Sequence, residues 1–267
     1  MNNPTNDLHQ AAHIVPPTPY PDVNVVLRAL LSDVQAILGP HLVGVYLYGS
    51  LASGDFDPQR SDIDFVVVTA AELPDEMIAA LKAMHARLAA TGDKWATKLE
   101  GAYIPRRALR RYDPAGPPYP STNEGQFYLA RQGSDWVIQR HILREQGVVL
   151  AGPAPHTLID PVRTDDVQRA VRAFLREWWA PMLDEPARLR GSEYRAYAVL
   201  TMCRALYTLE NGAIVSKTGA ARWAQATLGG QWVAPIERAL AWPRAAPADD
   251  LDETLAFIRY TLERATP

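Results

Sequence analysis

Small residues and acidic residues lie at the ends of two consecutive predicted strands. Gly49 and Ser50 follow an apolar run, and their size lets backbone N–H groups and a hydroxyl approach a phosphate closely. Asp62 and Asp64 are separated by one residue, so in a strand both side chains project from the same face. Two carboxylates at that spacing can hold Mg²⁺ against the oxygens of a triphosphate. The pattern indicates a phosphoryl- or nucleotidyl-transfer site.

Such a transfer also needs a base for the acceptor hydroxyl. Glu100 lies in the next predicted strand, flanked by the apolar Leu99 and the small Gly101. Taken singly, these features have ordinary structural explanations, because a Gly-Ser pair is usually a turn and acidic residues in short strands usually face solvent. Their order, between two strands and in an apolar context, favours a catalytic site.

The N-terminal half alternates apolar runs with turn signals, which predicts an α/β domain. We expect Arg106–Asn123, which is rich in proline and arginine, to form a loop. Strands are predicted over Val43–Tyr48, Ile63–Val68, Trp95–Ile104 and Val148–Leu150, and helices over Pro21–Leu38, Leu73–Ala90 and Asp135–Glu145.

The composition changes after residues 152–155, a Gly-Pro-Ala-Pro segment typical of a linker. Helices are predicted over Thr164–Trp179, Ser192–Asn211, Ser216–Leu228, Ala234–Trp242 and Asp250–Arg264, the first three capped by Thr164, Ser192 and Ser216. The predicted fold is α+β, with a mixed sheet and flanking helices followed by an α-helical bundle. We expect residues 1–21 to be disordered, 22–155 to form the first domain, and 156–267 to form a second domain that closes a cleft.

Composition and charge exclude several classes of protein. The 267 residues are 48% hydrophobic and carry a net charge of -3, so a basic field that would attract nucleic acid is lacking. The single cysteine, Cys203, excludes a disulfide framework and fits a reducing cytoplasm. The start of the chain lacks the blocks of a signal peptide, and no apolar run approaches the length of a membrane span. We therefore expect a soluble cytoplasmic protein without a nucleic-acid or membrane partner.

The order Gly-Ser, spacer, Asp-hydrophobic-Asp-hydrophobic resembles the polymerase-β-like nucleotidyltransferase superfamily. More narrowly, the chain is similar to the aminoglycoside adenylyltransferases that modify streptomycin and spectinomycin. The matching segments are residues 45–50, Ser61–Asp64, the strand around Glu100, Asp135–Pro153, Leu200–Tyr207, Gly212–Lys217 and Arg222–Ala224. They follow the family's order in both predicted domains and span most of residues 25–265.

The resemblance implies transfer of AMP from ATP to a hydroxyl of an aminoglycoside or aminocyclitol antibiotic, with release of pyrophosphate and resistance as the result. By this resemblance Asp62 and Asp64 ligate Mg²⁺. Glu100 occupies the position of the base that accepts the proton of the acceptor hydroxyl, a role that a carboxylate can perform.

The same resemblance assigns the binding of ATP, the co-substrate, to residues of both domains. Gly49, Ser50 and Ser61 would hold its phosphates from the first domain. Arg204 and Lys217 would reach across from the helical domain, and both cations suit phosphate oxygens. Lys217 also opposes the dipole of its predicted helix at the first turn, which favours a nearby anion over a purely structural role.

The acceptor side follows from the charge of an aminoglycoside. A polycation needs carboxylates and aromatic faces around it. Asp135 matches an acidic position of the family, and Glu193, Tyr197 and Trp178 are further candidates. Other residues near the expected cleft are Trp179, Asp184 and Glu185. The adjacent tryptophans cannot both face the same side of a helix, so we expect one of them in the core.

Two features depart from the family pattern. Tyr197 stands where some relatives have a polar residue, and the preceding acidic residue is shifted to Glu193. The arginines of residues 106–111 would repel a polycation if they faced the cleft, whereas a solvated surface position would leave them neutral to binding. Alternative hypotheses are a transferase acting on another small molecule or on a protein, as antitoxin-like members do, and a non-catalytic nucleotide-binding protein. A monomer is expected.

Overall fold

The computed structural model describes residues 16–244 and 250–266. Most of the segment expected to be disordered, residues 1–15, lies outside this range. Within the described part, Thr18 is buried and its hydroxyl donates a hydrogen bond of 2.8 Å to Oδ1 of Asn24. This contact ties the chain to the helix that follows.

The first domain is built on a mixed six-stranded sheet in the order β5-β4-β3-β2-β1-β6. The two central strands, β2 and β3, run parallel, and the other neighbouring pairs are antiparallel. The strands are β1 Leu42–Leu47, β2 Ile63–Thr69, β3 Leu99–Pro105, β4 Tyr119–Asn123, β5 Gln126–Ala130 and β6 Val148–Ala151. The mixed sheet confirms the predicted fold class for this part of the chain.

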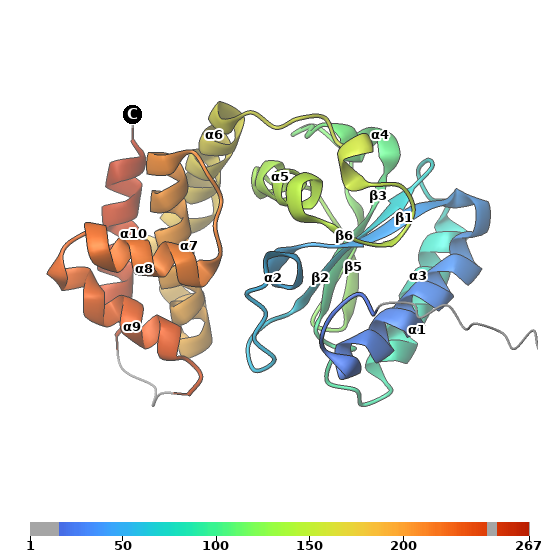
Figure 1. The fold of residues 1–267 in the computed structure, drawn as a ribbon, viewed down its shortest axis with the longest axis horizontal. Coiled ribbons are helices and arrows are strands. Elements are labelled where there is room, and N and C mark those ends of the chain that lie inside the picture. The colour runs from blue at the N-terminus through green and yellow to red at the C-terminus, as the bar shows by residue number, and fades with distance from the viewer. Residues whose placement is uncertain (1–15, 245–249, 267) are drawn as a thin grey trace, which may run out of the picture.

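Helices cover both faces of this sheet, as Figure 1 shows. On one face lie α1 Pro21–Leu38 and α3 Asp75–Ala89, and on the other lie α4 Arg106–Arg110 and α5 Asp135–Gln146. Residues of β2 are buried alternately in the two cores: Phe65 packs with the α1 side, and Val66 packs with the α5 side. A strand buried on both faces is held rigidly, and so are the groups at its ends.

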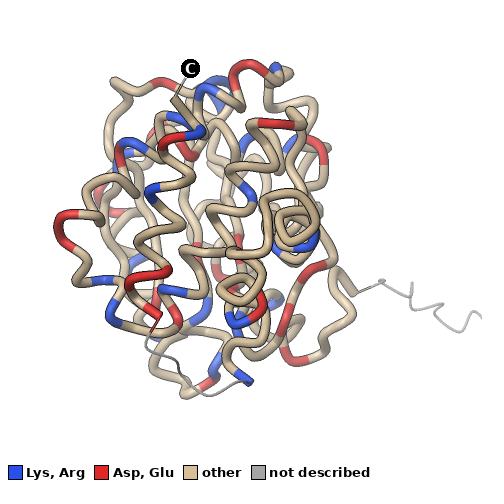
Figure 2. The backbone as a smooth tube through the Cα atoms, turned by 90° about the vertical axis from the view of Figure 1, so that its left-hand side faces the viewer, with Lys and Arg blue, Asp and Glu red and all other residues tan. Residues whose placement is uncertain are grey.

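The second domain is helical and lies beside the edge of the sheet domain that carries α2 Gly49–Ser53 (Figure 1). Its central helix, α7, is buried on several sides, with Ala198, Met202 and Cys203 inaccessible to solvent. The helices are α6 Thr164–Phe174, α7 Ser192–Asn211, α8 Lys217–Thr227, α9 Val233–Ala241 and α10 Leu251–Ala265. The surface charges of this domain are mixed in sign along its helices (Figure 2).

One prediction for the sheet domain was wrong, and two of its elements, β5 and α2, were not predicted. The segment Arg106–Asn123 is not a loop, because it contains α4 and β4, and β5 follows it. Proline is frequent in this stretch and conceals the strand, whose central residues Ser121 and Thr122 pair with β3. The short helix α2 directly after β1 was also unexpected.

The predicted helix caps agree with the structure at one position in three. Ser216 caps α8, since its Oγ accepts the N–H of Gly219 at 3.0 Å. Thr164 and Ser192 are instead the first residues of α6 and α7, and in the described structure no side-chain cap bond is formed by the residues preceding them. The helix predicted to end at Trp179 changes to a π-helix over Leu175–Trp179.

One helix has the length and apolar composition of a membrane span, although the sequence analysis expected no apolar run of that length. Among the described residues, Pro21–His41 is long and apolar enough to cross a bilayer. Core helices share these properties, and α1 buries Val23, Leu27, Leu30 and Val34 against the sheet. In this fold α1 is a core helix.

Candidate active site

The register of three strands brings the predicted catalytic residues together. Within the parallel pair β2 and β3, Asp64 lies directly beside Glu100. Because β1 runs antiparallel to β2, its carboxyl end reaches the start of β2, where the N–H of Tyr48 bonds to the carbonyl of Asp64 at 3.1 Å. The Gly49-Ser50 turn, Asp64 and Glu100 therefore lie together at one end of these strands.

A side chain at position 49 would collide with the predicted metal ligand. Gly49 has a φ of +63°, and a Cβ added there would lie 1.9 Å from Oδ2 of Asp64. The backbone N–H of the next residue, Ser50, bonds to the same carboxylate. Glycine is therefore required both by the left-handed backbone and by the close approach of Asp64.

The two adjacent carboxyls are held in an environment that disfavours their charge. Burial, with a contribution from Asp62, raises the pKa of Asp64 to about 7, although Lys217 and Arg204 counteract it. Burial and the nearby Asp64 raise the pKa of Glu100 to about 8. Carboxyls placed so close together attract a cation that would neutralise them.

Asp62 is the more exposed of the two predicted metal ligands. Its Oδ1 forms an ion pair with Nζ of Lys98 at 3.0 Å, and both side chains are partly open to solvent. Within the described ranges, no group of three or more His, Cys, Asp or Glu side chains is arranged to hold a metal ion. Mg²⁺ commonly takes only one or two carboxylates from a protein and its other ligands from phosphate oxygens and water, so two aspartates are enough for such a site.

The two predicted cations of the helical domain face this acidic pair. Lys217 begins α8 and Arg204 lies on α7. The positive charge of each side chain lowers the pKa of Asp64. Burial and the neighbouring Arg204 lower the pKa of Lys217. Its Nζ lies 5.3 Å from the ring centroid of Tyr197. Two cations next to each other at the surface of a helical bundle indicate an anionic ligand between the domains.

Ser61, predicted to contact phosphate, is engaged within its own loop. Its Oγ accepts the N–H of Asp57 at 3.0 Å. A hydroxyl that accepts one hydrogen bond can still donate another. The structure therefore places Ser61 beside Asp62 with its proton available to a ligand.

The acceptor candidates occupy different environments. Burial raises the pKa of Asp135, and the charge of this carboxylate raises the pKa of Tyr48. Glu193 is exposed, and its charge helps to raise the pKa of Lys98. The exposed Trp178 donates its Nε1–H to Oη of Tyr194 at 3.1 Å. Asp135, Asp64 and Glu100 thus all lie near Tyr48, whereas Glu193 and Trp178 are exposed.

The tryptophan pair behaves as expected, since Trp179 is fully buried and Trp178 is exposed. Trp179 packs against Tyr194 and Tyr197, with ring centroids 6.0 and 5.7 Å away. Asp184 and Glu185 are exposed near the end of this segment. An aromatic cluster therefore extends from the neighbourhood of Lys217 to the exposed face of Trp178.

Two residues near the site were not singled out from the sequence. Tyr48 is buried, and its pKa is raised well above the usual value by burial and by Asp64, Glu100 and Asp135. Its signal in the sequence is its position directly before Gly49. Glu177 joins the domains, because Oγ of Ser134 donates to its Oε2 at 2.9 Å.

The arginines of α4 are paired with carboxylates at the surface. Arg107 forms an ion pair with Glu72, while Arg110 and Arg111 both contact Asp160. These side chains are largely exposed, Arg111 at 82%. The structure therefore supports a solvated surface position for this cluster and not a position facing the cleft, although the segment is a helix and not a loop.

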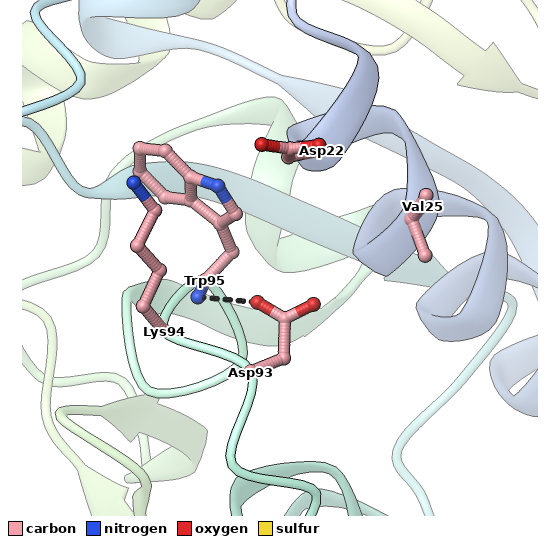
Figure 3. A pocket seen from close by; sticks show the side chains of 5 residues that line it. All are labelled: Asp22, Val25, Asp93, Lys94 and Trp95. Atoms are coloured by element: carbon pink, nitrogen blue, oxygen red, sulfur yellow. Dashed lines mark hydrogen bonds between the residues drawn. The ribbon is translucent and has the colours of Figure 1, made fainter.

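A cavity of about 240 Å³ lies away from these residues (Figure 3). It is formed by the first turns of α1 and the segment before β3. Its lining consists of Asp22, Val25, Asp93, Lys94 and Trp95. It contains no predicted site residue, so the carboxylates at the ends of β2 and β3 are the stronger indication of function.

Comparisons with known proteins agree with this geometry. Residues 27–104 match the nucleotidyltransferase domain family, and residues 157–264 match the C-terminal domain of aminoglycoside adenylyltransferases. An aminoglycoside (3'') (9) adenylyltransferase of Shigella flexneri is 28% identical over 258 residues, covering 89% of this chain and 94% of the relative. A spectinomycin 9-adenylyltransferase of Staphylococcus aureus is 27% identical over 207 residues, covering 73% of this chain and 75% of the relative.

A solved structure shares the fold. The crystal structure of a spectinomycin adenyltransferase from Enterococcus faecialis with ATP and spectinomycin superimposes with a TM-score of 0.73 at 18% identity. The match covers 90% of this chain and 98% of that one, so both domains are included.

Proposed function

The chain belongs to the aminoglycoside adenylyltransferase family, and we propose that it transfers AMP from ATP to a hydroxyl of an aminoglycoside or aminocyclitol. The observation that carries this proposal is the pairing of Asp64 with Glu100 at the strand edge, opposite Lys217 and Arg204. The acceptor oxygen attacks the α-phosphorus, the bond to the β-phosphate oxygen breaks, and pyrophosphate leaves.

Asp62 and Asp64 are the residues that would hold Mg²⁺. When bound, this ion neutralises charge on the triphosphate and lowers the cost of bringing a nucleophile to it. The raised pKa of Asp64 fits this role, because a carboxyl that is costly to ionise alone is stabilised as the anion by a cation.

The triphosphate would lie between the two domains. On the sheet side, Gly49 lets the phosphates approach the backbone closely, and Ser50 and Ser61 add hydroxyls. On the helical side, Lys217 and Arg204 supply positive charge to the leaving pyrophosphate. In this proposal both domains contribute phosphate contacts.

Glu100 is proposed as the general base. Burial and the neighbouring Asp64 raise its pKa above the usual value for a glutamate, which makes the ionised carboxylate a stronger base than an exposed one. Parallel pairing fixes it beside Asp64, so the acceptor hydroxyl that it contacts is also close to the metal ligands. The proton moves from the acceptor oxygen to the Glu100 carboxylate as the new bond to phosphorus forms.

The acceptor would bind next to Glu100, on the side of Asp135 and Tyr48. Asp135 offers a carboxylate for an ammonium group of the antibiotic, and the rings of Tyr197 and Trp178 offer faces for cations or for the apolar face of a sugar. Glu193 adds a negative charge further out. These groups suit a polycation of moderate size.

The test is a pyrophosphate-release assay with ATP, Mg²⁺ and a panel of aminoglycosides and aminocyclitols. We expect turnover with at least one of them. Glu100→Gln removes the proposed base and should lower kcat by about 100-fold or more while the affinity for ATP is retained. Arg107→Gln, at an exposed ion pair, is the control that should match the wild type. Binding of Mg-ATP without turnover on any panel member would reject the antibiotic and leave another acceptor or a binding role.

A further inference from the structure

The loop between α2 and β2, residues 54–62, is anchored in the sheet domain by Phe56. This ring is buried between Tyr20 and Trp95, with centroids 4.7 and 5.5 Å away. Oη of Tyr20 also donates to the carbonyl of Phe56 at 3.2 Å. Figure 3 shows Trp95 at the border of the cavity beneath α1. One side of the loop is therefore held by the aromatic core.

Asp57 organises the polar part of the same loop. Its Oδ1 accepts the N–H of Gln59 at 3.0 Å, and its carbonyl accepts the N–H of Ser61 at 2.8 Å. Its Oδ2 lies 3.3 Å from Nε of Arg60. These contacts form a compact turn that ends directly before Asp62, so the turn has one defined conformation.

This turn also contacts the end of α9 in the helical domain. Nη2 of Arg244 donates to Oδ2 of Asp57 at 2.8 Å. Nη1 of Arg60 donates to the carbonyl of Leu240 at 3.2 Å. Figure 1 shows the loop after α2 extending toward the helical domain. One carboxylate, Asp57, thus holds two guanidiniums that link the domains.

A third contact reaches the helix that carries the phosphate-binding lysine. The N–H of Thr218 donates to Oδ2 of Asp55 at 3.4 Å, and Thr218 follows Lys217 at the start of α8. A carboxylate at a helix N-terminus is stabilised by the helix dipole. The loop therefore contacts the helical domain at two places, the end of α9 and the start of α8, next to Lys217.

We propose that Asp57, paired with Arg244, is a positioning residue that fixes the helical domain on the loop so that Lys217 stays directed at the nucleotide site. This inference rests on the proposed function, because it concerns the binding of ATP phosphates. Asp57 and Arg244 do not touch the nucleotide in this scheme. They act through the orientation of α8.

The test is the affinity for Mg-ATP, measured by calorimetry, of Arg244→Gln in two backgrounds. Arg244 is more than half exposed, so its replacement leaves the folded state intact. In the wild-type background we expect about a two- to fivefold weaker affinity, the size of a partly exposed ion pair. In the Lys217→Ala background the same substitution should change nothing, because the group that it positions is missing.

Two controls separate positioning from a general effect of charge. Arg244→Lys keeps the pair with Asp57 and should restore the affinity, whereas Arg107→Gln removes a distant exposed cation and should leave it unchanged. Asp57→Asn keeps an oxygen for Gln59 and should weaken ATP binding without adding to Arg244→Gln.

The outcomes distinguish this inference from the proposed function. A wild type that fails to bind Mg-ATP overturns both. A wild type that binds it, with Arg244→Gln unchanged or equally weakened in the two backgrounds, overturns only the role of Asp57 and Arg244.

Discussion

At the scale of single residues, the site depends on a contact that only glycine permits. Gly49→Ala would place a methyl group at 1.9 Å from Oδ2 of Asp64, so the carboxylate must move. We expect Mg²⁺-dependent binding of ATP to be lost, together with about 1–2 kcal/mol of stability from the left-handed backbone. Calorimetry with and without Mg²⁺, and denaturant unfolding, measure the two effects.

Gly54 provides a matched control for this substitution. It has a φ of +73°, and a Cβ added there would meet no described atom within 4 Å. Gly54→Ala should therefore show a similar loss of stability while keeping the response to Mg²⁺. Equal loss of metal-dependent binding in both variants would show that backbone strain, and not the contact with Asp64, is what matters.

A buried histidine predicts part of the pH dependence of stability. His85 is buried, its Nε2 lies 2.8 Å from Oη of Tyr103, and burial lowers its pKa to about 4. The unfolded chain takes up this proton near pH 6.5 and the folded chain does not, so the free energy of unfolding falls as the pH drops from about 6.5 to 4. The full stability contributed by the neutral ring is present above pH 6.5.

His85→Gln, which keeps a polar group for Tyr103, tests this linkage. Between pH 4 and 6.5 the wild type should lose up to about 1.4 kcal/mol per pH unit more than the variant. Denaturant unfolding at a series of pH values gives both slopes. Parallel slopes would mean that the ring is protonated in the folded protein.

At the scale of the elements, mutations can test whether α1 is a core helix that packs with one side against the sheet. Leu30 is inaccessible to solvent, whereas Val25 on the same helix is 52% exposed. Leu30→Ala should cost about 2–5 kcal/mol of unfolding free energy, because it leaves a cavity in the core. Val25→Ala should stay within about 0.5 kcal/mol of the wild type. Similar effects of the two substitutions would contradict a one-sided core helix.

The elements that hold the catalytic groups were predictable because their patterns are local. Apolar runs bounded by glycine and acidic residues marked β1 and β2, and Ser216 marked the start of α8. By contrast, β4 is stabilised by pairing with β3 and β5 by pairing with β4, which no local pattern reports, and proline further conceals β4. The register that sets Asp64 beside Glu100 follows from the parallel pairing, which the linear sequence does not display.

Contacts between the domains were the least predictable part of the site. Asp57 and Arg244 are 187 residues apart, and nothing in either neighbourhood marks them as partners. Arg204 and Lys217 were assigned to the site through family resemblance, since a cation on a helix is otherwise a surface residue. Their proximity to Asp64 depends on how the helical domain is placed.

At the scale of the whole molecule, the proposed division of phosphate contacts between the two domains predicts how ATP would stabilise the protein. Gly49 and Ser50 belong to the sheet domain and Lys217 to the helical domain, so Mg-ATP should increase hydrogen-exchange protection in both 49–64 and 214–227. At 100 times its dissociation constant, ATP should add about 2.7 kcal/mol to the free energy of unfolding.

Lys217→Ala separates the two contributions. In this variant the sheet-domain segment 49–64 should still be protected by Mg-ATP, though at a higher nucleotide concentration, while the protection of 214–227 should disappear. The reason is that Lys217 supplies the charge by which α8 contacts the phosphates, whereas Asp64 and the Gly49 turn remain intact. If the wild type shows ATP-dependent protection in 49–64 alone, the helical domain does not bind the nucleotide, and the electrostatic attraction between Lys217 and Asp64 serves only to hold the domains together.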